Sequence, residues 1–423
     1  MDTDTMQQLL SQAQARQEEG DWTQAVAIYG RILTCIPPYT RESKAIDVRL
    51  QALAAQTNLL TLQENYQQAL DLSERFYAEA TSDKHKLVAL LRIANSASRT
   101  GYYPRAIVTC KEALRLARDH HDEMSKAKAL TLLGSVYTST DRLEDAIIYF
   151  KKSIALAEKL KDVPLQANVW NRLGLAYQRR GKLSKAIQCH ERNLRLVASI
   201  GEDNVTLQMI ALNNLGEDYL FLYHTQKAMQ YFQQGLAMKD NSSRLDIISD
   251  LYRNQGMALC YEYQAKAGLE SLYQALQLCE QSHNVNLQLQ AYYSLALAEL
   301  QADNREQAFH FAQKLQEFAE RSSVRSQKAK ALYALGLYER QMGDEEQAKQ
   351  ILEEALFLAH ETRQRFLRWQ IHAELAHIAT TPGLRDVHLR LAAELIQEIA
   401  APLEDEELRQ IFLAAPPVQN VLN

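Results

Sequence analysis

The stretch WNRLGLAYQRRGKLSKA, residues 170–186, decides the fold. Its two glycines, Gly174 and Gly181, and the Lys182 after the second one suggest a phosphate-binding loop. Such a loop needs four residues between its glycines and a Ser or Thr directly after the lysine. Here six residues separate the glycines, and Leu183 follows the lysine. The stretch fails the phosphate motif, so its meaning has to come from the rest of the chain.

A small residue like Gly174 recurs along the chain at an almost constant distance. It stands at Ala94, Gly134, Gly174, Gly216, Gly256, Ala296, Gly336 and Ala376. Successive positions are 40 residues apart, except for one step of 42. A second column lies twelve positions later, at Ala106, Ala146, Ala186, Ala228, Gly268, Ala308 and Ala348, and the last unit breaks it with His388. A fixed period of this length predicts a repeat protein.

Each unit predicts two antiparallel helices. Offsets of 3, 4 and 7 place the first apolar stripe on one side of a helix with 3.6 residues per turn. Gly181 is expected to end this helix as a left-handed cap, and Ser184 lies near the start of the next one. Gly174 and Ala186 would let the two helices approach closely, and stacked pairs would form a solenoid. The first stripe is Trp170, Leu173, Gly174 and Tyr177, and the partner stripe begins at Ala186, Ile187 and Leu194.

The order W-x2-L-G-x2-Y followed by A resembles the tetratricopeptide repeat (TPR), in a form with long helices and a period of about 40 residues. LLGSVYTSTDRLEDAIIYFKKSIALAEKLKD and LNNLGEDYLFLYHTQKAMQYFQQGLAMKD carry the same pattern. The resemblance implies an all-α, right-handed TPR α-solenoid with about nine repeats and a C-terminal capping helix pair. We expect irregular N-terminal units over residues 1–83, a regular array over 84–365, and capping helices with a tail over 366–423.

The composition is that of a folded chain in the cytoplasm. Of the 423 residues, 47% are hydrophobic and 23% are charged, which is ordinary for a globular protein. No run of eighteen apolar residues occurs, and the N-terminus MDTDTMQQLL is acidic and polar, so neither a membrane segment nor a leader is expected. An odd number of cysteines without C-x-x-C spacing predicts reduced thiols packed mostly in helices. They are Cys35, Cys110, Cys189, Cys260 and Cys279.

The net charge of −5 conceals a basic segment. Residues 81–200 hold 22 Lys or Arg against 11 Asp or Glu, which gives +11. Residues 1–80 carry −5 and residues 201–423 carry −11. A charge excess of this kind is either a solvated face or a surface for a partner with carboxylates or phosphates.

No motif predicts catalysis, a cofactor or a metal. In HAELAH, His372 and His377 are five residues apart, whereas zinc-binding histidines on a helix are four apart and share one face. One of the two is expected to face the core and the other not. His120 and His121 lie between predicted helices without other ligands nearby. No Gly-x-Ser-x-Gly elbow or dinucleotide fingerprint occurs, so we do not expect an enzyme.

The resemblance to TPR proteins also predicts a binding surface. In that family the first helix of each pair lines a concave groove, which here places the stripe Asn168, Asn171, Leu175 and Gln178 toward a ligand. Side-chain amides offer both donors and acceptors, which suits an extended peptide backbone. The predicted partner-binding residues are Arg92, Asn95, Arg99, Lys128, Asn171, Arg172, Gln178, Arg179, Asn213, Asn214, Arg253, Asn254, Tyr293 and Tyr333.

One alternative for these columns stays open. The asparagines can form hydrogen bonds only between repeats, without contacting a ligand. The chaperone-binding members of the family hold a terminal carboxylate with a set of Lys, Asn and Arg, but Leu175 and Asp250 break that set here.

Three classes of function follow from these patterns. The first is a scaffold resembling the Pins-type adaptors, which bind an extended and here preferably acidic protein or peptide. The second is a peptide-responsive regulator resembling the bacterial Rap-type sensors. The C-terminal LEDEELRQIFLAAPPVQNVLN is similar to the end of repeat arms in bacterial signalling ATPases. The third class, nucleic-acid binding through the basic segment, is less favoured because stacking aromatic residues are not interleaved with it.

Overall fold

A computed structural model describes residues 3–38, 40, 42–63, 65–201, 204–242, 244–282, 285–322 and 325–423. Over these residues the chain forms 22 α-helices, a 3₁₀ helix at Lys239–Asn241, and no strand. The prediction of an all-α solenoid is confirmed. Nine helix pairs run from the N-terminus, and a tenth pair with two short helices follows them, as the sequence predicts in number.

Contacts divide the chain into two compact units, Met1–Asp162 and Val163–Asn423. The sequence-based division at residues 83 and 365 stays a prediction. The first unit contains α1 (Thr3–Glu18), α2 (Trp22–Cys35), α3 (Ser43–Leu62), α4 (Tyr66–Glu79), α5 (Asp83–Arg99), α6 (Tyr103–Asp119), α7 (Glu123–Ser139) and α8 (Leu143–Leu160). The second contains α9 (Val163–Arg179), α10 (Leu183–Ile200), α11 (Val205–Phe221), α12 (Thr225–Leu236), α13 (Leu245–Tyr261), α14 (Ala265–Gln281), α15 (Val285–Gln301), α16 (Arg305–Ser322), α17 (Arg325–Met342), α18 (Glu345–Glu361), α19 (Arg365–His377), α20 (Pro382–Ala400), α21 (Glu406–Ala414) and α22 (Pro416–Leu422).

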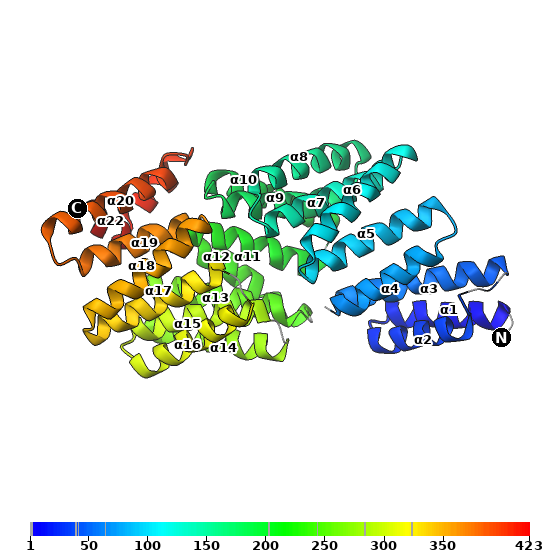
Figure 1. Cartoon of the computed structure of the whole chain (residues 1–423), viewed down its shortest axis with the longest axis horizontal. Coiled ribbons are helices and arrows are strands. Elements are labelled where there is room, and N and C mark those ends of the chain that lie inside the picture. Colours follow the sequence, from blue (N-terminus) through cyan, green and yellow to red (C-terminus); the bar gives the residue numbers. More distant parts are fainter. Residues whose placement is uncertain are drawn as a thin grey trace. The chain divides into compact units, whose positions relative to one another are not determined.

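The first helices of successive pairs form one layer within each unit (Figure 1). Every helix from α1 to α8 and from α9 to α20 packs on the next one in its own unit. In addition, α1, α3, α5 and α7 pack on one another in sequence, and so do α9, α11, α13, α15, α17 and α19. We call the second of these sets the inner layer of unit 2. A repeat protein needs such neighbour contacts because one helix pair cannot bury its apolar stripe alone.

The small-residue column matches the size of the side chain 16 positions later. A Cβ atom on any of five glycines in the column would lie less than 3.0 Å from that side chain. These pairs are Gly134 with Phe150, Gly174 with His190, Gly216 with Phe232, Gly256 with Leu272, and Gly336 with Leu352. Where the column holds alanine, the residue 16 positions later is small and buried: Ala94 with Cys110, Ala296 with Ala312, and Ala376 with Ala392. The column therefore admits a side chain from the second helix, which refines the expected close approach of the two helices.

The turn inside each repeat has a left-handed residue whether or not that residue is glycine. Gly181 has φ +76°, so its predicted role as a left-handed cap is confirmed. The same position in other repeats is held by Gly101, Asp141, Tyr223, Tyr263, Asp303 and Gly343, with φ between 57° and 89°. A left-handed conformation is strained for a bulky residue such as tyrosine. The turn geometry belongs to the repeat, and glycine at this position is only its easiest solution.

The C-terminal segment of unit 2 packs back on α10 (Figure 1). Ser184 lies in the first turn of α10, but Lys182 occupies the N-cap position. The Ser184 hydroxyl lies 3.3 Å from the carbonyl oxygen of Pro402 and accepts a hydrogen bond from the Glu404 amide at 3.1 Å. Leu183 and Phe412 belong to one apolar core. The start of unit 2 and its end are thus in direct contact.

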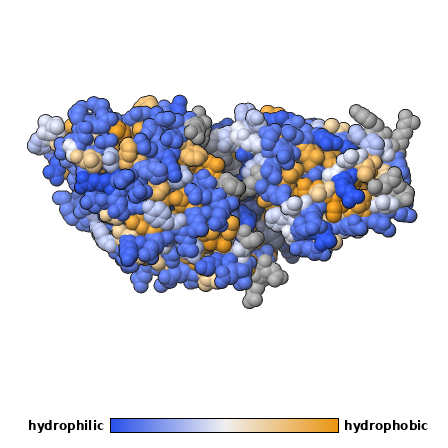
Figure 2. Space-filling view, turned by 90° about the horizontal axis from the view of Figure 1, so that it is seen from below, coloured by the Kyte–Doolittle hydropathy of each residue, from blue (hydrophilic) through white to orange (hydrophobic). Residues whose placement is uncertain are grey.

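Polar side chains cover most of the face shown in Figure 2, with hydrophobic areas between them. Exposed large apolar residues occur in both units, for example Val108, Tyr263 and Phe357. No helix in the described ranges is long and apolar enough to cross a membrane. Four of the five cysteines are buried, and only Cys35 is exposed.

Candidate functional site

The predicted partner-binding residues of unit 2 all lie on its inner layer. They are Asn171, Arg172, Gln178 and Arg179 on α9, Asn213 and Asn214 on α11, Arg253 and Asn254 on α13, Tyr293 on α15, and Tyr333 on α17. The helical period that selected these columns therefore places them on helices that pack on one another.

The asparagines form hydrogen bonds from one repeat to the next. The Asn214 Nδ2 donates to Asn171 Oδ1 at 2.7 Å, and the Asn254 Nδ2 donates to Asn213 Oδ1 at 2.9 Å. Asn213 also donates to Asp250 Oδ2 at 2.7 Å. Since Asn213 and Asn254 are buried, their hydrogen bonds link α11 to α13 within the inner layer. The hydrogen bonds between repeats that the sequence allowed as an alternative are present.

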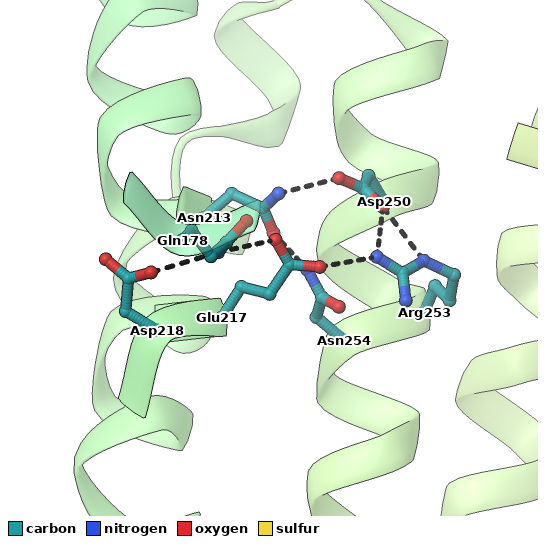
Figure 3. A network of polar contacts seen from close by, with 7 residues as sticks. All are labelled: Gln178, Asn213, Glu217, Asp218, Asp250, Arg253 and Asn254. Atoms are coloured by element: carbon teal, nitrogen blue, oxygen red, sulfur yellow. Dashed lines mark hydrogen bonds and ion pairs between the residues drawn. The ribbon is translucent and has the colours of Figure 1, made fainter. Parts of the chain in front are cut away.

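Charged groups continue this network toward the inner surface (Figure 3). Arg253 donates through Nε and Nη2 to Asp250 Oδ1 at 2.9 and 2.7 Å, and its Nη2 lies 3.3 Å from Glu217 Oε1. Gln178 Nε2 donates to Glu217 Oε2 at 3.2 Å and to Asp218 Oδ1 at 2.9 Å. Burial raises the pKa of Glu217, while the charge of Arg253 opposes that rise. The network joins three helices, α9, α11 and α13.

A buried histidine stands behind this network. His190 Nδ1 lies 2.6 Å from Asp218 Oδ2, and neither side chain is exposed. Its ring fills the space above Gly174 that a phenylalanine or leucine fills in other repeats. Burial raises the pKa of Asp218, and its contacts with His190 and Gln178 act in the opposite direction. Gln178 therefore connects the inner surface to a polar pair in the core.

Four tyrosines and one lysine gather on the inner surface of unit 2. We call Lys330, Tyr223, Tyr261, Tyr293 and Tyr333 the inner cluster. The Lys330 Nζ lies 5.3 Å from the centroid of the Tyr293 ring, and the rings of Tyr223 and Tyr261 are 5.1 Å apart. Burial raises the pKa of each tyrosine, to about 12 for Tyr261, so all four hydroxyls stay protonated near neutral pH.

The inner layer is strongly curved at this cluster. A straight stack would separate α11 from α19 by four repeats, or roughly 40 Å at the spacing of packed helices. Instead, the ring centroids of Phe221 on α11 and Phe366 on α19 are only 5.1 Å apart. Burial, together with the positive charges of Arg253 and Arg179, lowers the pKa of Lys330 to about 8, against the negative charge of Glu217. Helices that are four repeats apart therefore approach one another on the inner layer.

A pocket of about 230 Å³ with both polar and apolar lining opens beside the hydrogen-bonded asparagines. It lies between α11, α13 and α15, and is lined by Ile210, Asn213, Asn214, Asp246, Ile247, Asp250, Asn286 and Leu287. Carboxylates and amides surround it, so the pocket offers acceptors and donors but no excess of positive charge.

Several residues of this site were not predicted to bind a partner, although they lie in the same columns as residues that the sequence singled out. Lys330 and Asp250 lie in the column of Asn168, Glu217 lies in the column of Leu175, and Tyr261 lies in the column of Arg179. Extension of the Asn168, Leu175 and Arg179 columns to every repeat would have included them. Tyr223 was harder to predict from the sequence, because it lies in the turn between two helices and outside the helical columns.

In unit 1, the predicted residues lie on α5 and α7. Arg92 is partly buried, and burial lowers its pKa. The exposed Arg99 guanidinium lies 5.6 Å from the centroid of the Tyr66 ring. Asn95 is half-buried and Lys128 is exposed. Their role as a partner surface stays a prediction, as does that of the basic segment.

The histidines behave as their spacing predicts. His372 is buried and His377 is exposed, so they lie on different faces of α19. His372 Nδ1 lies 3.0 Å from Nδ1 of His388, the residue that breaks the second small column. His120 and His121 lie in an exposed turn. Among the described residues, no three His, Cys, Asp or Glu side chains are grouped so as to hold a metal ion.

Comparison with known proteins agrees with these repeats. A family described as "Tetratricopeptide repeat" matches residues 86–159 and 165–241, and a second model of the same description matches 329–359. A search of curated proteins finds no match to the chain.

Among solved structures, a Rap protein complexed with competence and sporulation factor has a TM-score of 0.59 at 14% identity, over 84% of this chain and 99% of that one. The apo form of the quorum sensor NprR from B. thuringiensis has a TM-score of 0.58 at 13% identity, over 84% and 99%. A signal transduction ATPase with a tetratricopeptide repeat sensor from Pyrococcus horikoshii has 0.52 at 17% identity, over 87% of this chain and 55% of that one. The chain contains tetratricopeptide repeats over the matched residues, and its fold resembles that of Rap-type proteins.

Proposed function

We propose that the chain is a non-enzymatic adaptor that binds an extended peptide or protein segment on the inner layer of unit 2. The observation that carries this proposal is the pair formed by Asn171 and Asn214. Their mutual hydrogen bond uses one Nδ2 proton of Asn214 and the Oδ1 of Asn171. The amide donors of Asn171 and the carbonyl oxygen of Asn214 have no hydrogen-bond partner among the described residues. A donor and an acceptor side by side match the pattern of a peptide unit.

Asn213 and Asn254 have a different part in this proposal. They form hydrogen bonds with each other and with Asp250, so they hold α11 and α13 together rather than contact the ligand. The pocket lined by Asn214 and Asp250 supplies space beside the pair for a ligand side chain.

A peptide-responsive signalling regulator in the cytoplasm is the alternative form of this function. It is favoured by the contact of Ser184 with Pro402 and Glu404, because a ligand on the inner layer can strengthen or weaken a contact between the two ends of unit 2. The structural relatives supply an analogy of fold, since one is described as a quorum sensor and another is complexed with a factor.

Selection of a peptide on the full-length chain tests the proposal. A displayed library of random twelve-residue peptides would be selected against the wild type, and binding of the recovered peptide measured by fluorescence anisotropy. Replacement of both Asn171 and Asn214 by alanine should weaken binding about 30-fold, from about 1 kcal/mol for each of two hydrogen bonds. The control is Gln316→Ala, since Gln316 is partly exposed on α16, outside the inner layer, and donates a hydrogen bond to Glu320 of the same helix. Equal affinity of both variants would exclude the pair as the binding element.

The adaptor and the sensor differ in their response to the peptide. A sensor should change its radius of gyration in small-angle scattering when the peptide saturates it, and the Ser184→Ala variant should change its peptide affinity. An adaptor should show neither effect.

A further inference from the structure

Lys330 is a cation without an anionic partner. It lies on the inner layer and is only partly exposed. Within the described part of the chain, its ammonium group forms no hydrogen bond or ion pair, and it lies over the face of the Tyr293 ring. Arg253 on the same surface is paired with both Asp250 and Glu217. A partly buried charge is costly unless it is paired, so the position of Lys330 requires a reason.

The carboxylates near Lys330 are already engaged by another cation. Glu217, whose negative charge acts on Lys330, accepts a hydrogen bond from Arg253, and so does Asp250 beside it. The positive charges of Arg253 and Arg179 both oppose the charged form of Lys330. A negative charge brought by a ligand would therefore supply the partner that the chain itself does not give to this ammonium group.

The tyrosines supply donors for that negative charge. The hydroxyl of Tyr223 interacts with Gln370. In the described ranges, the hydroxyls of Tyr261, Tyr293 and Tyr333 take part in no hydrogen bond. Because burial keeps them protonated, each can donate to an anion. A lysine ammonium together with neutral hydroxyls is a donor set suited to a carboxylate.

We infer that the inner cluster is a carboxylate-binding subsite, which takes one acidic group of a peptide lying along the inner layer of unit 2. This inference rests on the proposed function, since it names the group that the bound peptide must carry. A doubly charged phosphate fits less well, because Glu217 and Asp250 lie at the same centre and would repel the second charge.

The protonation of Lys330 provides a readout that is independent of affinity. A carboxylate beside the ammonium favours its charged form and opposes the effect of burial. Binding at pH 8 should therefore be accompanied by uptake of a fraction of a proton. The facing groups are Arg179 on α9, Glu217 on α11, Asp250 and Arg253 on α13, and Tyr293 on α15, so the comparison with a Lys330 variant isolates the contribution of this one group.

The test uses the peptide recovered on the full-length chain and a second peptide in which Asp and Glu are replaced by Asn and Gln and the C-terminus is amidated. Two further peptides carry only one of these changes, and so separate a side-chain carboxylate from the terminal one. Wild type, Lys330→Met and Lys328→Met are compared by titration calorimetry in two buffers at pH 8. Lys328 is a matched control because it lies on α17 but is paired with Glu354 on α18.

The wild type and Lys328→Met should bind the acidic peptide at least 10-fold more tightly than its neutral form and take up protons. Lys330→Met should lose both the preference and the proton uptake, with an unfolding midpoint no lower than that of the wild type. If the acidic peptide binds Lys330→Met as well as Lys328→Met, the subsite is wrong and the proposed function stands. If no peptide binds the wild type, the proposed function is wrong and the subsite falls with it.

Discussion

Arg49 in unit 1 and Lys330 in unit 2 are both withdrawn from water, but the fold treats them in opposite ways. The Arg49 side chain is 2% exposed and donates hydrogen bonds to both oxygens of Glu79 and to the carbonyl groups of Leu33 and Ile36. It links α3 with α4 and with the end of α2. Lys330 has no such partner among the described residues. Full pairing is expected of a cation that holds the fold together, and its absence is expected of one that awaits a ligand.

The strongest test of this contrast is removal of the paired cation. Arg49→Met should lower the free energy of unfolding of unit 1 by about 3–5 kcal/mol, because the largely buried Glu79 and two carbonyl groups lose their donors. Urea denaturation of the full chain, followed by circular dichroism, would measure it. The control is Arg99→Met, since Arg99 is exposed and should change stability by less than about 0.5 kcal/mol. A loss below about 1 kcal/mol for Arg49→Met would remove the contrast.

His372 in unit 2 represents a third solution, in which a buried base stays neutral. Burial lowers its pKa to about 4, and the positive charges of His388 and Arg368 contribute. The unfolded chain has a histidine pKa near 6.5, so it takes up the proton first as the pH falls. The stability from neutral His372 is complete above pH 6.5 and is lost as the pH falls toward 4.

Unit 2 should therefore lose about 2 kcal/mol from this residue between pH 7 and pH 5, at 1.36 kcal/mol for each pH unit below 6.5. Chemical denaturation at both pH values would measure the difference. His372→Phe should reduce the dependence on pH by that amount, whereas the exposed His377→Phe should leave it unchanged. An unaltered dependence in His372→Phe would show that this histidine is not the cause.

A larger residue in the small-residue column should lower the free energy of unfolding by about 1–3 kcal/mol, because the column matches the size of the side chain 16 positions later. Gly174→Val should lower stability by that amount, because the added atoms would meet the His190 ring, which its contact with Asp218 holds in place. Gly383→Ala is the control, since nothing lies within 4 Å of a Cβ at that glycine. A cost for Gly174→Val no larger than that of the control would mean that the helices separate easily.

These contrasts also explain how much was predictable from the sequence. The period of 40 residues identified the helix pairs, and the column of Asn171 identified the inner layer, because both depend on helical spacing. The two partners of Arg253 could not be identified in this way, since they come from two different columns in two repeats. The pairing of Ser184 with Glu404 joins residues 220 positions apart. Contacts of this kind depend on the curvature of the stack, which no single repeat encodes.

The size match is a regularity that the sequence contains but that the small-residue column alone does not reveal. Each glycine of the column is followed 16 positions later by a large residue, and each alanine by a small one. The spacing of Gly174 and His190 is therefore enough to predict that they pack together. A column of small residues indicates only a helix crossing, whereas the two columns together show that a large side chain faces glycine and a small one faces alanine.

The smallest predicted effect concerns the left-handed turn, which both units share. Asp141 in unit 1 and Gly181 in unit 2 stand at the same position, with φ 59° and 76°. Aspartate tolerates this conformation better than most residues, because its short side chain can hydrogen-bond locally. Gly181→Asp should therefore lower the free energy of unfolding by less than about 1 kcal/mol, and Gly181→Val should lower it by about 1–2 kcal/mol, measured by urea denaturation. The reverse change, Asp141→Gly, should be close to neutral, since relief of strain opposes the larger entropy of the unfolded chain. If Gly181→Asp were as costly as Gly181→Val, the turn of unit 2 would need glycine for contact with Arg365, 3.6 Å from a Cβ at that position, rather than for its backbone conformation.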